Sequence, residues 1–342
     1  MPGDRGTVLC VDDEPNIVRA LQWLLQTEFD VQTATSGQEA LALVRLNDFD
    51  VVISDQRMPG MSGVELLREV RRTSPRSVRI LLTGYSDMQA ILRSVNESEI
   101  WRFINKPWNI SELPKIVEQA VHIARTQPPE PPPIELSESA PIAADRSDTV
   151  LLIDDDPEMK RLIETIVGSS VRLRHAPSMS DAVEFLNKNA VSVIVTETHV
   201  GGVDATRLIR LMKQRRPDVI SVVFSAQADA EMIAKLINEG QIFRFMPKPV
   251  REGYLKLVIN SALVKHQQLV DLPGLAARHA VAGADAGSLE AMRDELARKS
   301  APSELSGGSL PPATGPQTKG LVDKMSAGVR GLLRPQGGRD KG

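Results

Sequence analysis

The chain has 342 residues, with 41 basic and 44 acidic side chains and a formal net charge of -3. This length predicts two ordinary domains with separate cores, and the balanced charge excludes the strongly basic surface of a general nucleic-acid binder. The one cysteine, Cys10, excludes an intramolecular disulfide, and neither a signal-peptide pattern nor an apolar run of about 18 residues is evident. We therefore expect a cytoplasmic protein that has no nucleic-acid partner.

Short apolar runs alternate with amphipathic stretches along the first third of the chain. The apolar runs predict strands at 7–11, 31–34, 51–53, 78–82 and 101–105. Helices are expected after each strand, the last at about 111–125, and three of them begin at capping boxes: Ser36 with Glu39, Ser62 with Glu65, and Ser86 with Gln89. Five strands alternating with five helices predict an α/β domain with a doubly wound parallel sheet and right-handed crossovers.

The same pattern occurs twice, on either side of a proline-rich segment. Residues 126–147 contain clustered prolines, which predict a semi-rigid linker. Beyond it, adding 142 to a position in the first unit gives its counterpart without a gap, so that NESEIWRFINKP at 96–107 matches NEGQIFRFMPKP at 238–249. This duplication predicts two similar domains, at 5–125 and 148–266.

Residues 267–342 are rich in Gly, Ala, Ser and Pro, which predicts a largely disordered tail with short helices at 288–299 and 319–334. The second helix would place its apolar residues in one arc, opposite basic positions. Gly328 and Gly331 would weaken that helix by about 1 kcal/mol each. A helix that docks on a partner or a membrane stays open as an alternative, but a disordered tail is the favoured interpretation.

Charged and hydroxyl side chains end several strands of the first unit: Asp12 and Asp13, Asp55, Thr83 and Lys106. The carboxyl ends of parallel strands share one edge of a sheet, where ligands bind in such folds. Grouped carboxylates repel one another unless a cation neutralises them, and an all-oxygen site suits Mg²⁺. A carboxylate there can attack phosphorus while a metal ion and an ammonium group absorb the charge on the transferring oxygens.

These residues stand in the motifs VDDEP, ISDQRMPGMSG, LLTGYSD and FINKPW. At these motifs the chain resembles the receiver domains of two-component response regulators, with the first unit matching throughout. The resemblance implies a flavodoxin-like (βα)5 fold in each unit. The sequence of residues 83–109 also resembles receivers joined to cyclic-di-GMP phosphodiesterases and to hydrogenase-type regulators.

The resemblance further implies a role for each site residue. Asp55 would accept a phosphoryl group from a histidine kinase or a phosphotransfer protein, and Thr83 and Lys106 would bind that group. Phosphorylation would pull Thr83 and Phe103 inward and remodel the face formed by the fourth helix, fifth strand and fifth helix. The implied Mg²⁺ ligands are Asp13, Asp55 and the backbone carbonyl of Arg57, with Asp12 acting through water, and the Lys106–Pro107 peptide bond would be cis.

The second unit departs from the pattern at the acceptor position. Asp154, Asp155, Ser225, Phe245 and Lys248 match the first unit, but the counterpart of Asp55 is Glu197, whose extra methylene would carry its carboxylate past the metal towards Lys248. In-line attack depends on placement to well under about 1 Å. Gly201 and Ala205 also replace Pro59 and Gly63. We therefore predict a degenerate receiver that docks or dimerises, with residual Mg²⁺ binding left open.

The prediction is a tandem receiver protein that signals through an unidentified protein effector, with pairing of two copies left open. We expect no enzyme beyond self-phosphorylation from small donors and self-dephosphorylation. The alternative from another class is a Mg²⁺-dependent phosphohydrolase with an aspartyl-phosphate intermediate, but Arg57 stands where such hydrolases of the haloacid type carry their acid. A mononucleotide-binding protein is less favoured because no Gly-rich turn follows the first strand.

Overall fold

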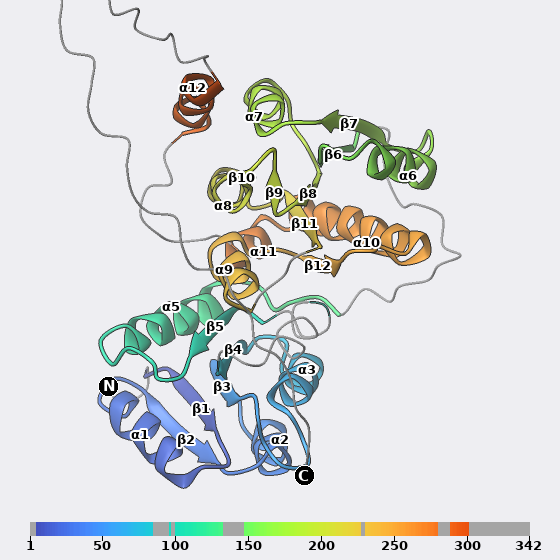
Figure 1. Ribbon diagram of the computed structural model, residues 1–342. Helices are drawn as coiled ribbons and strands as arrows, with labels where there is room; N and C mark the ends of the chain where they lie inside the picture. Colours follow the sequence, from blue (N-terminus) through green and yellow to red (C-terminus); the bar gives the residue numbers. More distant parts are fainter. Residues whose placement is uncertain are drawn as a thin grey trace, which may run out of the picture. The chain divides into compact units, whose positions relative to one another are not determined.

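The structure is a computed structural model, and it describes residues 5–84, 96, 100–132, 147–226, 230–279 and 288–300. The first unit contains a five-stranded parallel sheet in the order β2-β1-β3-β4-β5 (Figure 1). Its elements are β1 (Thr7–Val11), α1 (Pro15–Leu25), β2 (Asp30–Ala34), α2 (Gly37–Leu46), β3 (Val51–Asp55), α3 (Gly63–Thr73), β4 (Val78–Thr83), β5 (Arg102–Asn105) and α5 (Leu113–Thr126). The predicted doubly wound α/β fold is confirmed.

The second unit repeats this topology, with strand order β12-β11-β8-β6-β7. Its elements are β6 (Thr149–Ile153), α6 (Pro157–Val167), β7 (Arg172–Ala176), α7 (Met179–Lys188), β8 (Val193–Glu197), β9 (His199–Val200), β10 (Val203–Asp204), α8 (Thr206–Arg215), β11 (Ile220–Ser225), α9 (Ala230–Gly240), β12 (Arg244–Pro247) and α10 (Glu252–Asp271). The strand register follows the duplication, because Val8 pairs with Val51 and Val150 pairs with Val193. The two units are therefore the same fold at a spacing of 142 residues.

Helices cover both faces of the first sheet, which explains why β3 is buried along its whole length. Apolar residues of α1 and α5, such as Leu21 and Val117, pack in one cluster with Val51 and Ile53. Residues of α2 and α3, such as Leu67, pack on the other face. The backbone of β3 is thereby fixed, and Asp55 at its end has a defined position.

The predicted helix starts are found where the structure describes them. Ser62 and Glu65 form a complete capping box at α3. Ser36 accepts from the backbone N–H of Glu39 at 3.2 Å, but the Glu39 carboxylate binds Thr35 instead of closing the box. The box predicted at 86–89 lies outside the described residues.

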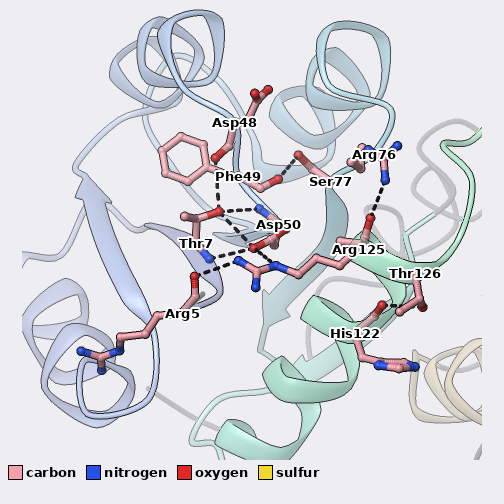
Figure 2. Close-up of polar contacts among 11 residues, drawn as sticks. Arg5, Thr7, Asp48, Phe49, Asp50, Arg76, Ser77, His122, Arg125 and Thr126 are labelled. Atoms are coloured by element: carbon pink, nitrogen blue, oxygen red, sulfur yellow. Dashed lines mark hydrogen bonds and ion pairs between the residues drawn. The ribbon is translucent and has the colours of Figure 1, made fainter. Parts of the chain in front are cut away.

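The amino edge of the first sheet is closed by a polar network (Figure 2). Asp50 accepts hydrogen bonds from the Thr7 backbone N–H at 2.9 Å and from Arg125 Nε at 3.0 Å. Arg125 also donates to the carbonyl of Arg5 at 2.8 Å. These bonds fix the end of α5 to the sheet at the edge away from Asp55, so both ends of the domain are held by specific contacts.

The structure differs from the prediction beyond residue 266. Helix α10 continues to Asp271, and a further helix, α11 (Pro273–Arg278), follows it. Leu269 and Leu275 are buried in the core of the second unit, which explains the added helical structure. Helix α12 (Leu289–Ser300) lies one residue from the predicted 288–299, and residues 319–334 lie outside the described part. No described helix is long and apolar enough to span a membrane.

Candidate functional site

The Lys106 side chain joins two carboxylates at the carboxyl edge of the first sheet. Lys106 Nζ lies 2.7 Å from Asp12 Oδ2 and also forms an ion pair with Asp55 Oδ1. Asp12 follows β1, Asp55 ends β3 and Lys106 follows β5, so three strand ends contribute to one cluster. The predicted convergence of these side chains is present.

Backbone groups hold the two carboxylates in place. The N–H of Glu14 donates to Asp12 Oδ1 at 3.0 Å, and the N–H of Arg57 donates to Asp55 Oδ2. Lys106 is aligned through its own N–H, which donates to the carbonyl of Thr83 at 2.9 Å. The Lys106–Pro107 peptide bond is cis, as the resemblance implied.

Burial decides the electrostatics of this cluster. Asp12 is fully buried, and desolvation raises the pKa of its carboxyl although Lys106 and the Glu14 N–H act in the opposite direction. Burial of Lys106 would lower the pKa of its ammonium, but hydrogen bonds and attraction to Asp12 and Asp55 outweigh burial and raise it. The site is thus a partly desolvated acidic pocket that favours added positive charge.

The donor set fits a hard divalent cation in its chemistry, because carboxylate and carbonyl oxygens at a strand edge are the ligands that Mg²⁺ prefers. In the arrangement seen here, the ammonium of Lys106 supplies the positive charge between Asp12 and Asp55. Asp13, the next residue after Asp12, is half-buried. Among the described residues, no three acidic, histidine or cysteine side chains are already arranged around a metal position.

The two predicted switch residues, Thr83 and Phe103, are both buried. The Thr83 hydroxyl donates to the carbonyl of Gly84 at 3.1 Å, and Phe103 is 3% exposed. Thr83 pairs in register with Asn105, next to Lys106. Strands β4 and β5 therefore connect the acidic pocket to Phe103.

The second unit has a differently connected pocket. Lys248 Nζ lies 2.7 Å from Glu197 Oε2 and 3.5 Å from Asp154 Oδ2. The Thr198 hydroxyl donates to Glu197 Oε1 at 3.0 Å and lies 2.9 Å from Ser225 Oγ. Glu197 is thus linked to Lys248 and, through Thr198, to Ser225.

The loop after Glu197 also differs from its counterpart after Asp55. Residues 199–204 form the small antiparallel hairpin β9–β10, turning at Gly201 and Gly202. Both glycines have positive φ, of 57° and 77°, as a two-residue hairpin turn of this kind requires. Neither the hairpin nor the role of Thr198 was predicted from the sequence, although the adjacent Gly201 and Gly202 are a signal for a hairpin turn.

Two doubly wound units, each with acidic residues and a lysine at the carboxyl edge of the sheet, define a tandem signalling module of the receiver class. The chain belongs to the response regulator receiver domain family, which matches residues 8–118 and 150–260. The tandem arrangement that the sequence predicted is confirmed.

Two transcriptional regulators each match about a third of the chain. The hydrogenase transcriptional regulatory protein HoxA of Cupriavidus necator is 46% identical over 121 residues, 35% of this chain and 25% of that protein. The DNA-binding transcriptional regulator NtrC of Salmonella typhimurium is 33% identical over 131 residues, 36% of this chain and 27% of that protein. The chain thus spans about a quarter of these relatives.

Among solved structures, the signal receiver domain of an HD domain-containing protein from Pseudomonas fluorescens Pf-5 is 34% identical. The match covers 36% of this chain and 100% of that chain, with a TM-score of 0.35.

Proposed function

We propose that Asp55 accepts a phosphoryl group from a phosphorylated histidine of a sensor kinase or a phosphotransfer protein in the cytoplasm. The observation that carries this proposal is the Lys106 ammonium held between Asp12 and Asp55. An Asp55 oxygen attacks phosphorus, the O–P bond forms as the N–P bond breaks, and the imidazole leaves with the electron pair and takes up a proton. Lys106 then stabilises the charge that develops on the phosphoryl oxygens.

Other groups of the site serve this step. Asp12, Asp13, Asp55 and the Arg57 carbonyl would hold Mg²⁺, which neutralises charge on the incoming phosphoryl group when bound. The Thr83 hydroxyl leaves the Gly84 carbonyl and binds a phosphoryl oxygen. Because β4 and β5 pair side by side, this movement changes the surroundings of Phe103 and the face around it.

The test is the mass of the intact protein after incubation with acetyl phosphate or phosphoramidate and Mg²⁺. We expect one added phosphate in the wild type, none in Asp55→Asn, and none when a chelator removes Mg²⁺. An Asp55→Asn protein that still gains one phosphate would refute the assignment.

An apolar groove beside Lys106 suits a helical phosphodonor protein. The groove has a volume of about 610 Å³ and is lined by Ile17, Ala20, Trp23, Leu24, Lys106, Pro107, Trp108 and Ile110. Trp23 is 72% exposed and Ile110 is 67% exposed, which is unusual for large apolar side chains on a free surface. We propose that the kinase or phosphotransfer protein docks here, next to the acceptor.

Trp23→Ala separates docking from chemistry. It should slow transfer from a phosphorylated histidine phosphotransfer protein by about ten-fold, because the complex loses an aromatic contact that docking would bury. It should leave uptake from acetyl phosphate unchanged. Equal slowing with both donors would contradict a docking role for Trp23.

We propose that the second receiver does not accept a phosphoryl group. Both oxygens of Glu197 are occupied, one by Lys248 and the other by Thr198. The carboxylate therefore fills the position that a phosphoryl oxygen would take. Signal output then depends on protein contacts made by the pair of receivers and on an effector that binds them.

A further inference from the structure

The edge strands of the two sheets make reciprocal contacts with the opposite receiver. β5 and β12 end their sheets, and an edge strand leaves backbone N–H and C=O groups without a strand partner. At β5, the Phe103 N–H donates to Asn238 Oδ1 at 2.8 Å, and Asn238 Nδ2 donates to the Phe103 carbonyl at 2.9 Å. One asparagine side chain of the second receiver thus binds both backbone groups of Phe103.

The same contact occurs in the other direction. Asn96 Nδ2 donates to the Phe245 carbonyl at 3.1 Å, and the Phe245 N–H donates to Asn96 Oδ1 at 3.3 Å. Asn96 and Asn238 are 142 residues apart, as are Phe103 and Phe245. Each receiver therefore gives its partner the contact that it receives, which is the defining property of a two-fold interface.

Apolar and polar contacts extend this interface. Gln241 Nε2 donates to the Trp101 carbonyl at 2.8 Å. Ile100 and Trp101 of the first receiver and Ile237 and Phe243 of the second are buried around one small cavity of about 50 Å³. The interface is thus closed to solvent at its centre, as in stable protein interfaces.

A buried carboxylate from the linker provides a second attachment. Glu130 is within 2.6 Å of Arg79 and 3.7 Å of Arg71 in the first receiver, and within 3.4 Å of Arg278 in α11. Arg278 also donates to the carbonyl of Arg76 at 3.0 Å. Charged groups that are buried together in this way disfavour separation, because each would lose a partner.

We propose that the second receiver is the resident partner of the first, forming within one chain the two-fold pair that two copies would otherwise form. The pair occupies the strand that leads from Phe103 to Lys106, so the face expected to change on phosphorylation is already bound by a receiver. Pairing itself needs no phosphate; only its regulatory consequence rests on the proposed function.

Hydrogen exchange of the full-length protein tests this pair, because each asparagine protects an amide in the other receiver. Asn238→Ala should speed exchange at the Phe103 amide on the order of five-fold or more, and Asn96→Ala should do so at the Phe245 amide. The matched controls are Asn47→Ala and Asn189→Ala, also 142 residues apart, whose side chains bind Leu43 and Phe185 within their own receivers. These controls should leave both amides unchanged.

Two results would overturn the proposal. One is unchanged exchange at Phe103 in Asn238→Ala and at Phe245 in Asn96→Ala. The other is wild-type protection of these amides that falls on dilution, which would place the contact between chains. Phosphate uptake by Asp55 is measured on the same samples, so loss of pairing and failure of the phosphoacceptor assignment are distinguished.

Discussion

Glu197 Oε2 lies 2.7 Å from Lys248 Nζ, at the positions where the first receiver pairs Asp55 with Lys106. The two ion pairs are 142 residues apart, but they have different surroundings. The other Glu197 oxygen accepts from both the N–H and the hydroxyl of Thr198, at 3.0 Å each. The longer side chain is therefore held at both oxygens.

Substitutions of Lys106 and Lys248, which occupy equivalent positions in the two receivers, form a matched pair. Lys106→Met removes the ammonium between Asp12 and Asp55, and the rate of phosphate uptake from acetyl phosphate should fall by about 100-fold or more. Lys248→Met should leave that rate within about two-fold, because Lys248 belongs to the other pocket. Similar losses in both variants would contradict a direct role for Lys106.

Glu197→Asp tests whether side-chain length blocks the second site. Shortening the side chain withdraws the carboxylate from Lys248 and restores the length found at Asp55, so a second phosphate should become detectable by intact mass. If the wild type already takes up two phosphates, the second receiver is an acceptor and the degenerate-site proposal is wrong.

Gly63 lies against the backbone of the acceptor residue. A Cβ at this position would be 2.1 Å from the Asp55 carbonyl oxygen and 2.7 Å from Leu81 Cδ1. Gly63→Ala should therefore lower the free energy of unfolding by about 2–3 kcal/mol and slow uptake, because the end of β3 must shift. Ala205→Gly, the reverse change at the N-cap of α8 in the second receiver, should change the free energy of unfolding by about 1 kcal/mol or less, because glycine is tolerated at an N-cap. Thermal unfolding and uptake rates measure both effects.

The titration of Lys213 should make the free energy of unfolding depend on pH. Its side chain is buried, and burial together with the charge of Lys265 lowers the pKa of its ammonium to about 7, against which Asp218 acts weakly. Between pH 7 and the ordinary value of about 10.4 the unfolded chain binds more protons than the folded one, so this group makes stability rise with pH. The cost of charging Lys213 is present in full below pH 7.

Lys213→Met removes this dependence. The free energy of unfolding of the variant minus that of the wild type should be largest near pH 6. This difference should fall by about 2–3 kcal/mol towards pH 9, because the wild type gains stability over this range. At the higher pH the lost hydrogen bonds to the carbonyls of Pro217 and Val219 should dominate. Lys188→Met, at an exposed i, i+4 pair with Glu184, is the control and should show no such trend. A pH-independent difference for Lys213→Met would contradict the lowered pKa.

Local patterns in the sequence predicted most of the fold and the centre of the site. Strand periodicity, the capping box at Ser62 and the 142-residue spacing located the elements, and the topology of a parallel sheet then placed Asp55 beside Lys106. Side-chain length at Glu197 correctly indicated contact with Lys248. These features depend on short-range sequence patterns and on the rule that the carboxyl ends of parallel strands share one edge of the sheet.

Contacts between distant segments could not be predicted in this way. Composition indicated a semi-rigid linker around Glu130, but it did not indicate that three arginines from separate elements surround this carboxylate. The repeat motif contained Asn96 and Asn238, but nothing in it specified that each would bind a phenylalanine backbone in the opposite receiver. Such contacts depend on how the two folded domains dock against each other.

The central claim is that Asp55 is the single phosphoacceptor, and peptide mapping after phosphorylation tests it most directly. The wild type is incubated with acetyl phosphate and Mg²⁺, the acyl phosphate is trapped chemically, and the modified residue is located by mass spectrometry. The account predicts one modification, at Asp55. Modification at Glu197, or at any residue in an Asp55→Asn protein, would contradict it.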